Sequence, residues 1–305
     1  MRYELTAASR TNPLDIRRKK LFENERLTIG VFESRPTHGA CGEVERQTLN
    51  AMVLPFSGLF ARHDSPGRQV TGTPSHAIYF APDAPYRISF PGAIGDRAII
   101  LRFDEALAPE QTGQWAGEGP AAQGLLPARA MMLRNLLWTR LQKGEADDFE
   151  AEALGLDLLN WSLESVRPGK MPARRSALAR RMRALERVKE AVASSPSDKW
   201  SVAKLAGVAN LSPFHLCHVF REMTGTSIYD YVLHERLAST LDAVLDCGDD
   251  LTAIALDAGF ASHSHFTARF RSFFGCTPGG LRRLASAAKV AELRKIVTAG
   301  ATRSA

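Results

Sequence analysis

Apolar and polar positions in the C-terminal third of the chain repeat one helical plan twice. The first copy, SVAKLAGVANLSPFHLCHVFREMTG, begins at Ser201, and the second, LTAIALDAGFASHSHFTARFRSFFG, begins at Leu251. In each copy apolar residues recur three and four positions apart on both sides of a short polar break. A helix with one apolar face packs that face inward, so the pattern predicts two helical hairpins.

The first copy carries recognisable start and stop signals. Ser201 is expected to cap the first helix, and Gly207 to end it in a left-handed turn. Ser212 followed by Pro213 predicts the start of the second helix, which buries Leu216 and its apolar neighbours. This second helix of about three turns fits the major groove of B-form DNA. The residues expected at the groove are Ser212, Phe214, His215, Cys217 and His218.

The second copy follows the same plan. Leu251 and Ile254 face inward, Gly259 makes the turn, and Ser262 caps a helix. The buried side of that helix is expected to be Phe266, Phe270 and Phe273. The outward residues are Ser262, His263, Ser264, His265, Thr267, Ala268, Arg269 and Arg271.

Residues 227–245 between the copies have apolar spacing typical of one long helix. At about 1.5 Å per residue this helix spans about 28 Å, close to the roughly 34 Å of one DNA turn. A rigid spacer of this length can offer two recognition helices to one face of a duplex. A plain helical bundle is the alternative that fits the same pattern.

Two segments, LSPFHLCHVFREMTGTSIYDYVLHERLASTLDAVL and LTAIALDAGFASHSHFTARFRSFFGCTPGGLRR, resemble the DNA-binding domain of AraC/XylS-type transcription regulators, over about residues 183–283. The resemblance implies a sequence-specific regulator that binds double-stranded DNA, with RNA polymerase as a further partner. The family usually has an aromatic residue where Leu281 stands and commonly an arginine where Ala268 stands. The first unit is therefore expected to discriminate sequence, and the second to contribute more to phosphate anchoring.

The charge distribution agrees with a DNA-binding second half. The chain has 39 Lys and Arg against 33 Asp and Glu, and residues 174–305 hold 19 of the basic and 12 of the acidic residues. The remainder is close to neutral. Phosphate contacts draw on such a basic excess, although a solvated basic surface would look the same.

The N-terminal half reads as β-rich. Short apolar or alternating runs between Leu27 and Phe103 are separated by Pro and Gly clusters. The run HAIYFAPDAPYRISFPG followed by RAIILRF resembles the cupin-like effector domain that often precedes an AraC-type domain. Residues 128–141 and 149–166 predict two amphipathic helices, either a dimer interface or an intrachain contact. The fold class expected is α+β: a cupin-like barrel with two helices, then a separate all-α domain.

A small-molecule effector is expected in the barrel. The aromatic residues that would line its pocket, or serve as plain core, are Phe56, Phe60, Tyr79, Tyr86 and Phe90. His38, His63 and His76 stand singly without an HxH pair, so no metal, cofactor or catalytic residue is predicted. A barrel enzyme with a helical appendage is the competing interpretation.

The expected domains are residues 1–170 for sensing and dimerisation, 174–290 for DNA binding, and a basic tail at 291–305. A break rich in Pro and Gly at 167–172 separates the first two. The four cysteines, Cys41, Cys217, Cys247 and Cys276, have no CxxC spacing, which favours reduced thiols. No apolar run long enough for a membrane span occurs in the sequence, and the expected location is the cytoplasm.

Overall fold

The computed structural model describes residues 14–65, 68–109, 122–167, 175–246, 248 and 250–286. The expected basic tail, residues 168–172 of the expected break, and Cys247 lie outside these ranges. The strands are β1 (Leu14–Glu23), β2 (Leu27–Pro36), β3 (Asn50–Gly58), β4 (Phe60–Ser65), β5 (Arg68–Gly72), β6 (His76–Phe80), β7 (Arg87–Ser89), β8 (Asp96–Phe103) and β9 (Gln123–Leu125). Two short 3-10 helices, η1 (Pro91–Ala93) and η2 (Glu105–Leu107), flank β8.

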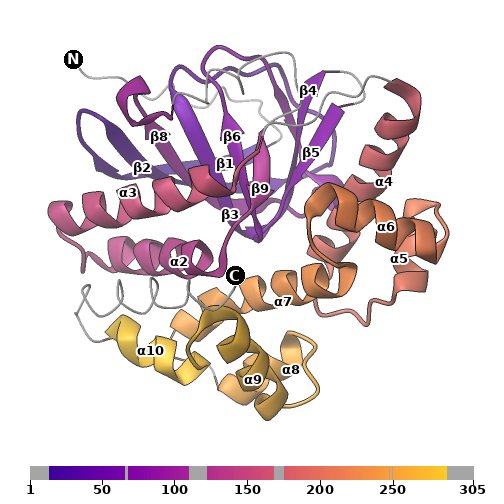
Figure 1. The fold of residues 1–305 in the computed structure, drawn as a ribbon. Helices are drawn as coiled ribbons and strands as arrows, with labels where there is room; N and C mark the ends of the chain where they lie inside the picture. Colours follow the sequence, from indigo (N-terminus) through magenta and orange to yellow (C-terminus); the bar gives the residue numbers. More distant parts are fainter. Residues whose placement is uncertain are drawn as a thin grey trace.

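The helices follow the strands. They are α2 (Ala128–Lys143), α3 (Asp148–Ser165), α4 (Arg175–Ser194), α5 (Val202–Ala209), α6 (Pro213–Thr224), α7 (Ile228–Leu245), α8 (Leu251–Asp257), α9 (His263–Phe274) and α10 (Pro278–Ser286). Both predicted amphipathic helices are present as α2 and α3, and the predicted spacer helix is present as α7. The α+β class, with a β-rich first half and a helical second half, is confirmed (Figure 1).

The strands form two antiparallel sheets. The larger has the order β1-β2-β8-β3-β6-β9, and the smaller the order β5-β4-β7. Within the described residues the strands therefore make two open sheets, where one closed barrel was expected. Because side chains alternate along a strand, each strand of the larger sheet sends one set toward the smaller sheet and the other toward the helices.

The buried apolar side chains of the described residues form three cores. One lies between the two sheets and includes Phe60, Phe80 and Phe90. A second joins α4, α5 and α6 with the N-terminal part of α7. The third runs from the outer face of the larger sheet through α2 and α3 to the C-terminal part of α7 and to α8, α9 and α10. The two halves were expected to be separate, but they share this third core, and α7 contributes to two of the three.

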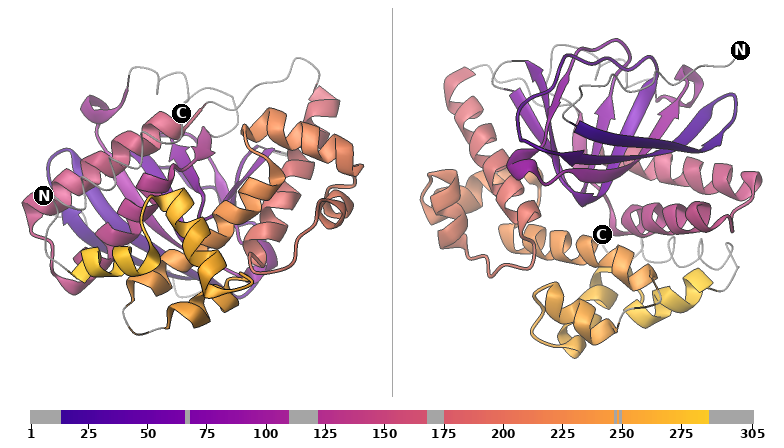
Figure 2. Two further views of the ribbon diagram at one scale, coloured as in Figure 1. Left: turned by 60° about the horizontal axis from the view of Figure 1, so that its bottom comes forward. Right: turned by 180° about the vertical axis from the view of Figure 1, so that it is seen from behind.

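The arrangement of the layers explains the sharing. In Figure 1 and in the right-hand view of Figure 2, α2 lies between the strands on one side and α10 on the other, and it also packs against β3 and α9. Met132 of α2 and Cys276, which precedes α10, meet with their sulfur atoms 4.0 Å apart. The apolar face of α2 is thus covered within the chain, which is the intrachain alternative for this helix.

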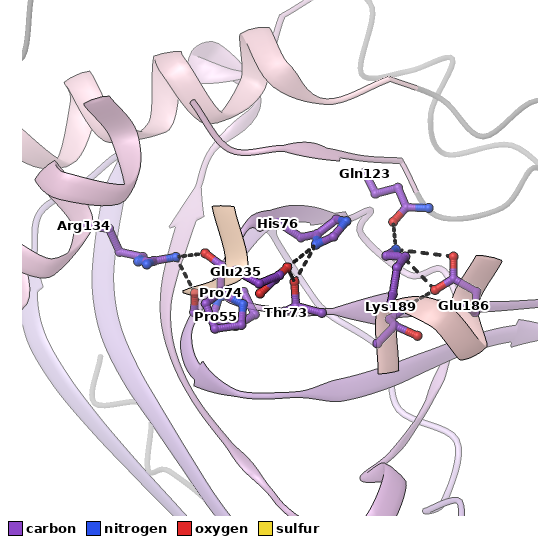
Figure 3. A network of polar contacts seen from close by, with 10 residues as sticks. Pro55, Thr73, Pro74, His76, Gln123, Arg134, Glu186, Lys189 and Glu235 are labelled. Carbon is purple, nitrogen blue, oxygen red and sulfur yellow. Dashed lines mark hydrogen bonds and ion pairs between the residues drawn. The ribbon is translucent and has the colours of Figure 1, made fainter. Parts of the chain in front are cut away.

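Buried polar contacts also join the halves (Figure 3). Thr73 donates its hydroxyl to Glu235 of α7, and the Thr73 hydroxyl lies 2.7 Å from Nδ1 of His76. Burial raises the pKa of Glu235 and lowers the pKa of His76 well below its usual value, so in both side chains burial disfavours the charged form. Within the first half, Arg134 of α2 is fully buried and donates to the carbonyls of Pro55 and Pro74.

Asp242 of α7 accepts hydrogen bonds from α2 and from the larger sheet. Asn135 of α2 donates to one of its carboxylate oxygens at 2.8 Å, and Arg97 of β8 donates to the other at 2.5 Å. Residues more than a hundred positions apart are thus fixed side by side. A shift of α2 or of β8 has to be accommodated by α7, the helix that links the two helical hairpins.

Candidate nucleic-acid interface and ligand pocket

Two helices of equal length, α6 and α9, present the candidate DNA-facing residues. In each a serine precedes the helix and accepts a hydrogen bond from the third residue beyond it: Ser212 from His215 N–H at 3.3 Å, and Ser262 from His265 N–H at 3.1 Å. The first turn of neither helix carries an acidic residue. The positive end of each helix dipole is therefore open to an anion such as a phosphate.

The exposed face of α6 contains most of the predicted set. Phe214 is 86% exposed, Cys217 and His218 are exposed, and His215 is half-buried. A phenylalanine exposed on this face is able to contact a thymine methyl group. His218 lies 3.9 Å from Glu222 one turn later, so its ring is positioned along the helix by a surface carboxylate.

The face of α9 has a different character. His263 and Thr267 lie 3.4 Å apart, and Arg269 points its Nε toward Nε2 of His265 at 3.5 Å. These pairs are exposed except for Thr267, which is half-buried. Arg271 is exposed in the last turn and Ala268 offers only a methyl group. The faces of the two helices therefore differ in chemistry although their caps are the same.

Two local predictions about the hairpins were wrong. Gly207 does not end α5; the helix continues to Ala209, and Asn210 takes the left-handed conformation at φ 53°. Asparagine adopts this region more readily than most residues other than glycine, so the sequence left two candidates for one position. Phe274 is the fully buried residue at the end of α9, whereas Phe273 is half-buried against the ring of His234 at 4.3 Å. Gly259, in contrast, has the expected positive φ of 79°.

Several arginines that count toward the basic excess hold the fold together. Arg187 donates to the last carbonyls of α5, Val208 at 3.0 Å and Ala209 at 2.8 Å. Arg282 does the same at the end of α7, donating to Val244 at 3.0 Å. Arg236 donates to the carbonyl of Pro196 at 2.7 Å. Sequence reasoning missed these roles, and they leave fewer cations for phosphate than the charge count implied.

The exposed cations of the helical half are of another kind. Arg183, Lys199, Lys204 and Arg221 are exposed, as are Arg269 and Arg271. They come from α4, from α5 and the residues before it, and from the two recognition helices. They are exposed to solvent, whereas the capping arginines are engaged with carbonyl groups at helix ends.

A cavity of about 70 Å³ lies between the two sheets of the first half. Phe60, Tyr86 and Phe90, three of the five predicted pocket residues, line it. Phe56 and Tyr79 do not, because they belong to the opposite face of the larger sheet, where Phe56 packs on Trp138 at 5.6 Å and Tyr79 donates to Asn50 at 2.5 Å. The remaining lining residues are Ile16, Arg18, Phe32, Glu45, Gln47, Val53, Phe80, Ile88, Asp96, Ile100 and Arg102.

Charged groups in this cavity were not predicted. Burial raises the pKa of Asp96 to about 7, and Ser34 donates to its carboxyl group at 2.7 Å. Burial and the neighbouring Glu45 raise the pKa of Tyr86 to about 12, so its phenol stays neutral, with Gln47 donating to it at 2.5 Å. The alternation of side chains along a strand predicts that Arg18 and Arg102 face the cavity, but this prediction requires the bounds of β1 and β8 to be known first.

The geometry and the sequence lead to the same class of domain. Residues 205–284 match the family model described as "Helix-turn-helix domain". The predicted resemblance is confirmed for this part of the chain: it is an AraC-type helix-turn-helix DNA-binding domain.

Regulators from several bacteria are similar to the chain. It is 32% identical over 145 residues to the HTH-type transcriptional regulator GlxA of Rhizobium meliloti, a match covering 44% of each chain. It is 23% identical over 254 residues to the probable transcriptional regulator LumQ of Photobacterium leiognathi, covering 77% of this chain and 96% of that one. The match to GlxA thus spans less than half of that relative.

A solved structure is also similar. It is a transcriptional regulator with an AraC-type DNA-binding domain from Chromobacterium violaceum, with 23% identity and a TM-score of 0.33. The match covers 35% of this chain and 95% of that one. Within the part of the chain that the structure describes, no helix is long and apolar enough to cross a membrane.

Proposed function

We propose that this protein is a sequence-specific DNA-binding transcription regulator whose N-terminal half senses a small molecule. The observation that carries the proposal is the pair of recognition helices α6 and α9, each serine-capped, free of acidic residues in its first turn and exposed along one face. Residues 174–290 form the DNA-binding part in this proposal and residues 1–170 the sensing part. The protein is a regulator in this view, without catalytic residues, and it acts in the cytoplasm where the DNA lies.

Readout is divided between the two units. On α6, Phe214 contacts thymine methyl groups and His218 donates to an acceptor on a guanine edge, with His215 and Cys217 beside them. On α9, His263, Ser264, His265 and Thr267 meet the groove, while Arg269 and Arg271 contact phosphates. Because α9 has an alanine where its counterpart α6 has His218, the first unit supplies more of the sequence discrimination.

Ligand binding acts through the shared core. The cavity lies on one face of the larger sheet, and α2 on the other face connects the sheet to α7 and α9. A ligand that favours one packing of the sheet changes the population of DNA-competent arrangements by its differential affinity. The homodimer and the contact with RNA polymerase stay predictions; since α2 is covered within the chain, a dimer would have to use another surface.

The test is selection of binding sites from random DNA by the full-length protein, followed by salt titration of the selected site. A regulator enriches one motif, and the logarithm of its affinity falls linearly with the logarithm of salt concentration. No enrichment at any salt concentration would favour an enzyme with a helical appendage and overturn the proposal.

A further inference from the structure

The wall of the cavity between the sheets combines charged and apolar side chains. Arg18 of β1 and Arg102 of β8 both line it, and the charge of Arg18 acts on the guanidinium of Arg102. Most of the other lining residues are aromatic or aliphatic, including Phe60, Phe80 and Phe90. A site of this composition fits a ligand that is apolar over most of its surface and carries one polar group.

Arg102 is half-buried, and no carboxylate of the described part of the chain forms an ion pair with it. Among the described residues no ion pair or hydrogen bond of its guanidinium to another side chain is found, and burial, followed by the charge of Arg18, lowers its pKa. A cation that has lost part of its hydration and faces a second cation is costly unless an anion joins it. The local backbone makes room for it: a Cβ on Gly30 of β2 would lie 4.0 Å from Nη1 of Arg102.

The acidic groups of the cavity are already engaged elsewhere. The carboxyl group of Asp96 accepts a hydrogen bond from the Ser34 hydroxyl at 2.7 Å, and the backbone N–H of Asp96 donates to the same hydroxyl at 2.9 Å. Glu45 lies 3.4 Å from the phenol of Tyr86. Neither carboxyl group is paired with an arginine of the cavity within the described residues, so both guanidinium groups keep their donors for a ligand.

We propose that the cavity binds a small monocarboxylic acid with an apolar body, its carboxylate held by Arg102 and Arg18 and its body seated among Phe60, Phe80 and Phe90. The planar fork of a guanidinium matches a carboxylate in two parallel hydrogen bonds, which gives this class an advantage over neutral molecules of the same shape. The volume of about 70 Å³ limits the enclosed part of the ligand to a small group. This inference rests on the proposed sensing function and names the chemical class that the sensor takes.

The experiment uses the full-length protein and four probes: phenylacetate and hexanoate, with phenylacetamide and hexanamide as uncharged counterparts. Calorimetric titration should show each carboxylate binding about tenfold to a hundredfold more tightly than its amide, because two charge-assisted hydrogen bonds are lost with the charge. Arg102→Met should abolish this preference, and Arg102→Lys should retain part of it. Lys19→Met, on the same strand as Arg18 but on the opposite face, should leave it unchanged.

Equal binding of carboxylates and amides, binding of none of the four, or an unchanged preference in Arg102→Met would each overturn the inference. Melting temperature is measured for every variant, and Arg18→Met provides a second charge deletion at the mouth of the cavity if Arg102→Met does not fold. Binding to the selected DNA site is measured in parallel, with and without carboxylate. Carboxylate binding without any change in DNA affinity keeps the inference and contradicts the sensing role, whereas absent DNA selectivity contradicts the regulator alone.

Discussion

Thr71 of β5 donates its backbone N–H to a carboxylate oxygen of Glu186 in α4 at 2.6 Å. β5 is an edge strand of the smaller sheet, and the carboxylate satisfies a donor that a further strand would otherwise take. The same carboxylate lies 3.2 Å from the ammonium of Lys189, which is only 2% exposed and also donates to Gln123 at 3.0 Å. Glu186 and Lys189 together therefore join the smaller sheet and β9 to α4, the first helix of the DNA-binding half.

Glu186→Ala should destabilise the protein strongly. It leaves the buried ammonium of Lys189 without a counter-ion and the Thr71 N–H without an acceptor, at a cost of about 3–5 kcal/mol in the free energy of unfolding. Urea denaturation measures this. Glu164→Ala, which removes a carboxylate whose side chain is 55% exposed in its pair with Arg129, should cost no more than about 1 kcal/mol. Equal losses for the two variants would contradict the buried role of Glu186.

Two glycines of the helical hairpins should respond in opposite ways to alanine. A Cβ on Gly259 would lie 2.4 Å from the carbonyl oxygen of Ser197 with φ at 79°, so Gly259→Ala should cost about 1–3 kcal/mol. A Cβ on Gly207 meets nothing within 4 Å inside an exposed turn of α5, so Gly207→Ala should stabilise by about 0.5–1 kcal/mol. Thermal melting of both variants checks the prediction, and it fails if Gly207→Ala lowers the melting temperature.

His218→Ala should relax sequence discrimination at one or two base pairs. Loss of a side-chain contact to a base edge costs about 1–3 kcal/mol at the position read and little elsewhere. Competition binding against single-base variants of the selected site measures this. His265→Ala in α9 is the matched comparison and should change discrimination less. A uniform loss of affinity across all sequences after His218→Ala would rule out base readout by this residue.

Arg271→Ala should reduce the salt dependence of DNA binding. Removing one phosphate contact lowers the slope of log affinity against log salt by about 0.9. Arg282→Met is the control, because its guanidinium caps α7 at Val244 and its loss should lower the melting temperature while leaving the slope unchanged. An unchanged slope for Arg271→Ala means that this side chain does not touch a phosphate.

Asp96 should make the stability of the protein depend on pH. Burial raises its pKa to about 7 in the folded chain, whereas the unfolded chain titrates near pH 4 by its ordinary value of about 3.9. Between about pH 4 and 7 the folded state holds the extra proton, so this contribution to stability is present below that window and is lost as pH rises through it. The slope is at most about 1.4 kcal/mol per pH unit.

Asp96→Asn removes this titration. Urea denaturation across the same pH range should show the stability of the wild type falling relative to the variant as pH rises, with no further change above about pH 8. Asp257→Asn, an exposed carboxylate of α8, serves as the control. A wild type that gains stability over Asp96→Asn with rising pH would contradict the direction of the shift.

Local signals in the sequence predicted much of the helical half. Ser201, Ser212, Ser227 and Ser262 each accept the hydrogen bond of a helix N-cap, because capping depends on residues two or three positions away. The same local signals gave the wrong end for α5, because both Gly207 and Asn210 are able to adopt the left-handed conformation and it is Asn210 that ends the helix. These signals could not decide between Phe273 and Phe274, since both lie near the inward side of the last turn of α9.

The β half was harder to predict for physical reasons. The edge strand β1 contains the run Arg17, Arg18, Lys19 and Lys20, which lacks the apolar alternation of an inner strand, as edge strands often do. β5 lies in a stretch rich in Pro and Gly that reads as a loop. Tyr79 and Phe80 are adjacent on β6 and face opposite ways, so only one of them could line the cavity. Hydrogen bonds between residues 60 or more positions apart, such as those of Arg134, Lys189 and Glu235, leave no local pattern in the sequence from which they could be predicted.

The core shared by α2, α7 and α9 has a consequence for handling the protein. Cutting the chain before α4 would strip the cover from Leu237, Leu241 and the neighbouring apolar surface of α7 and α9. Such a fragment would expose a contiguous apolar surface and would tend to self-associate. A truncated DNA-binding half would then report its own aggregation in a binding assay, and fusion or domain-swap designs would need polar replacements on that face before they could be informative.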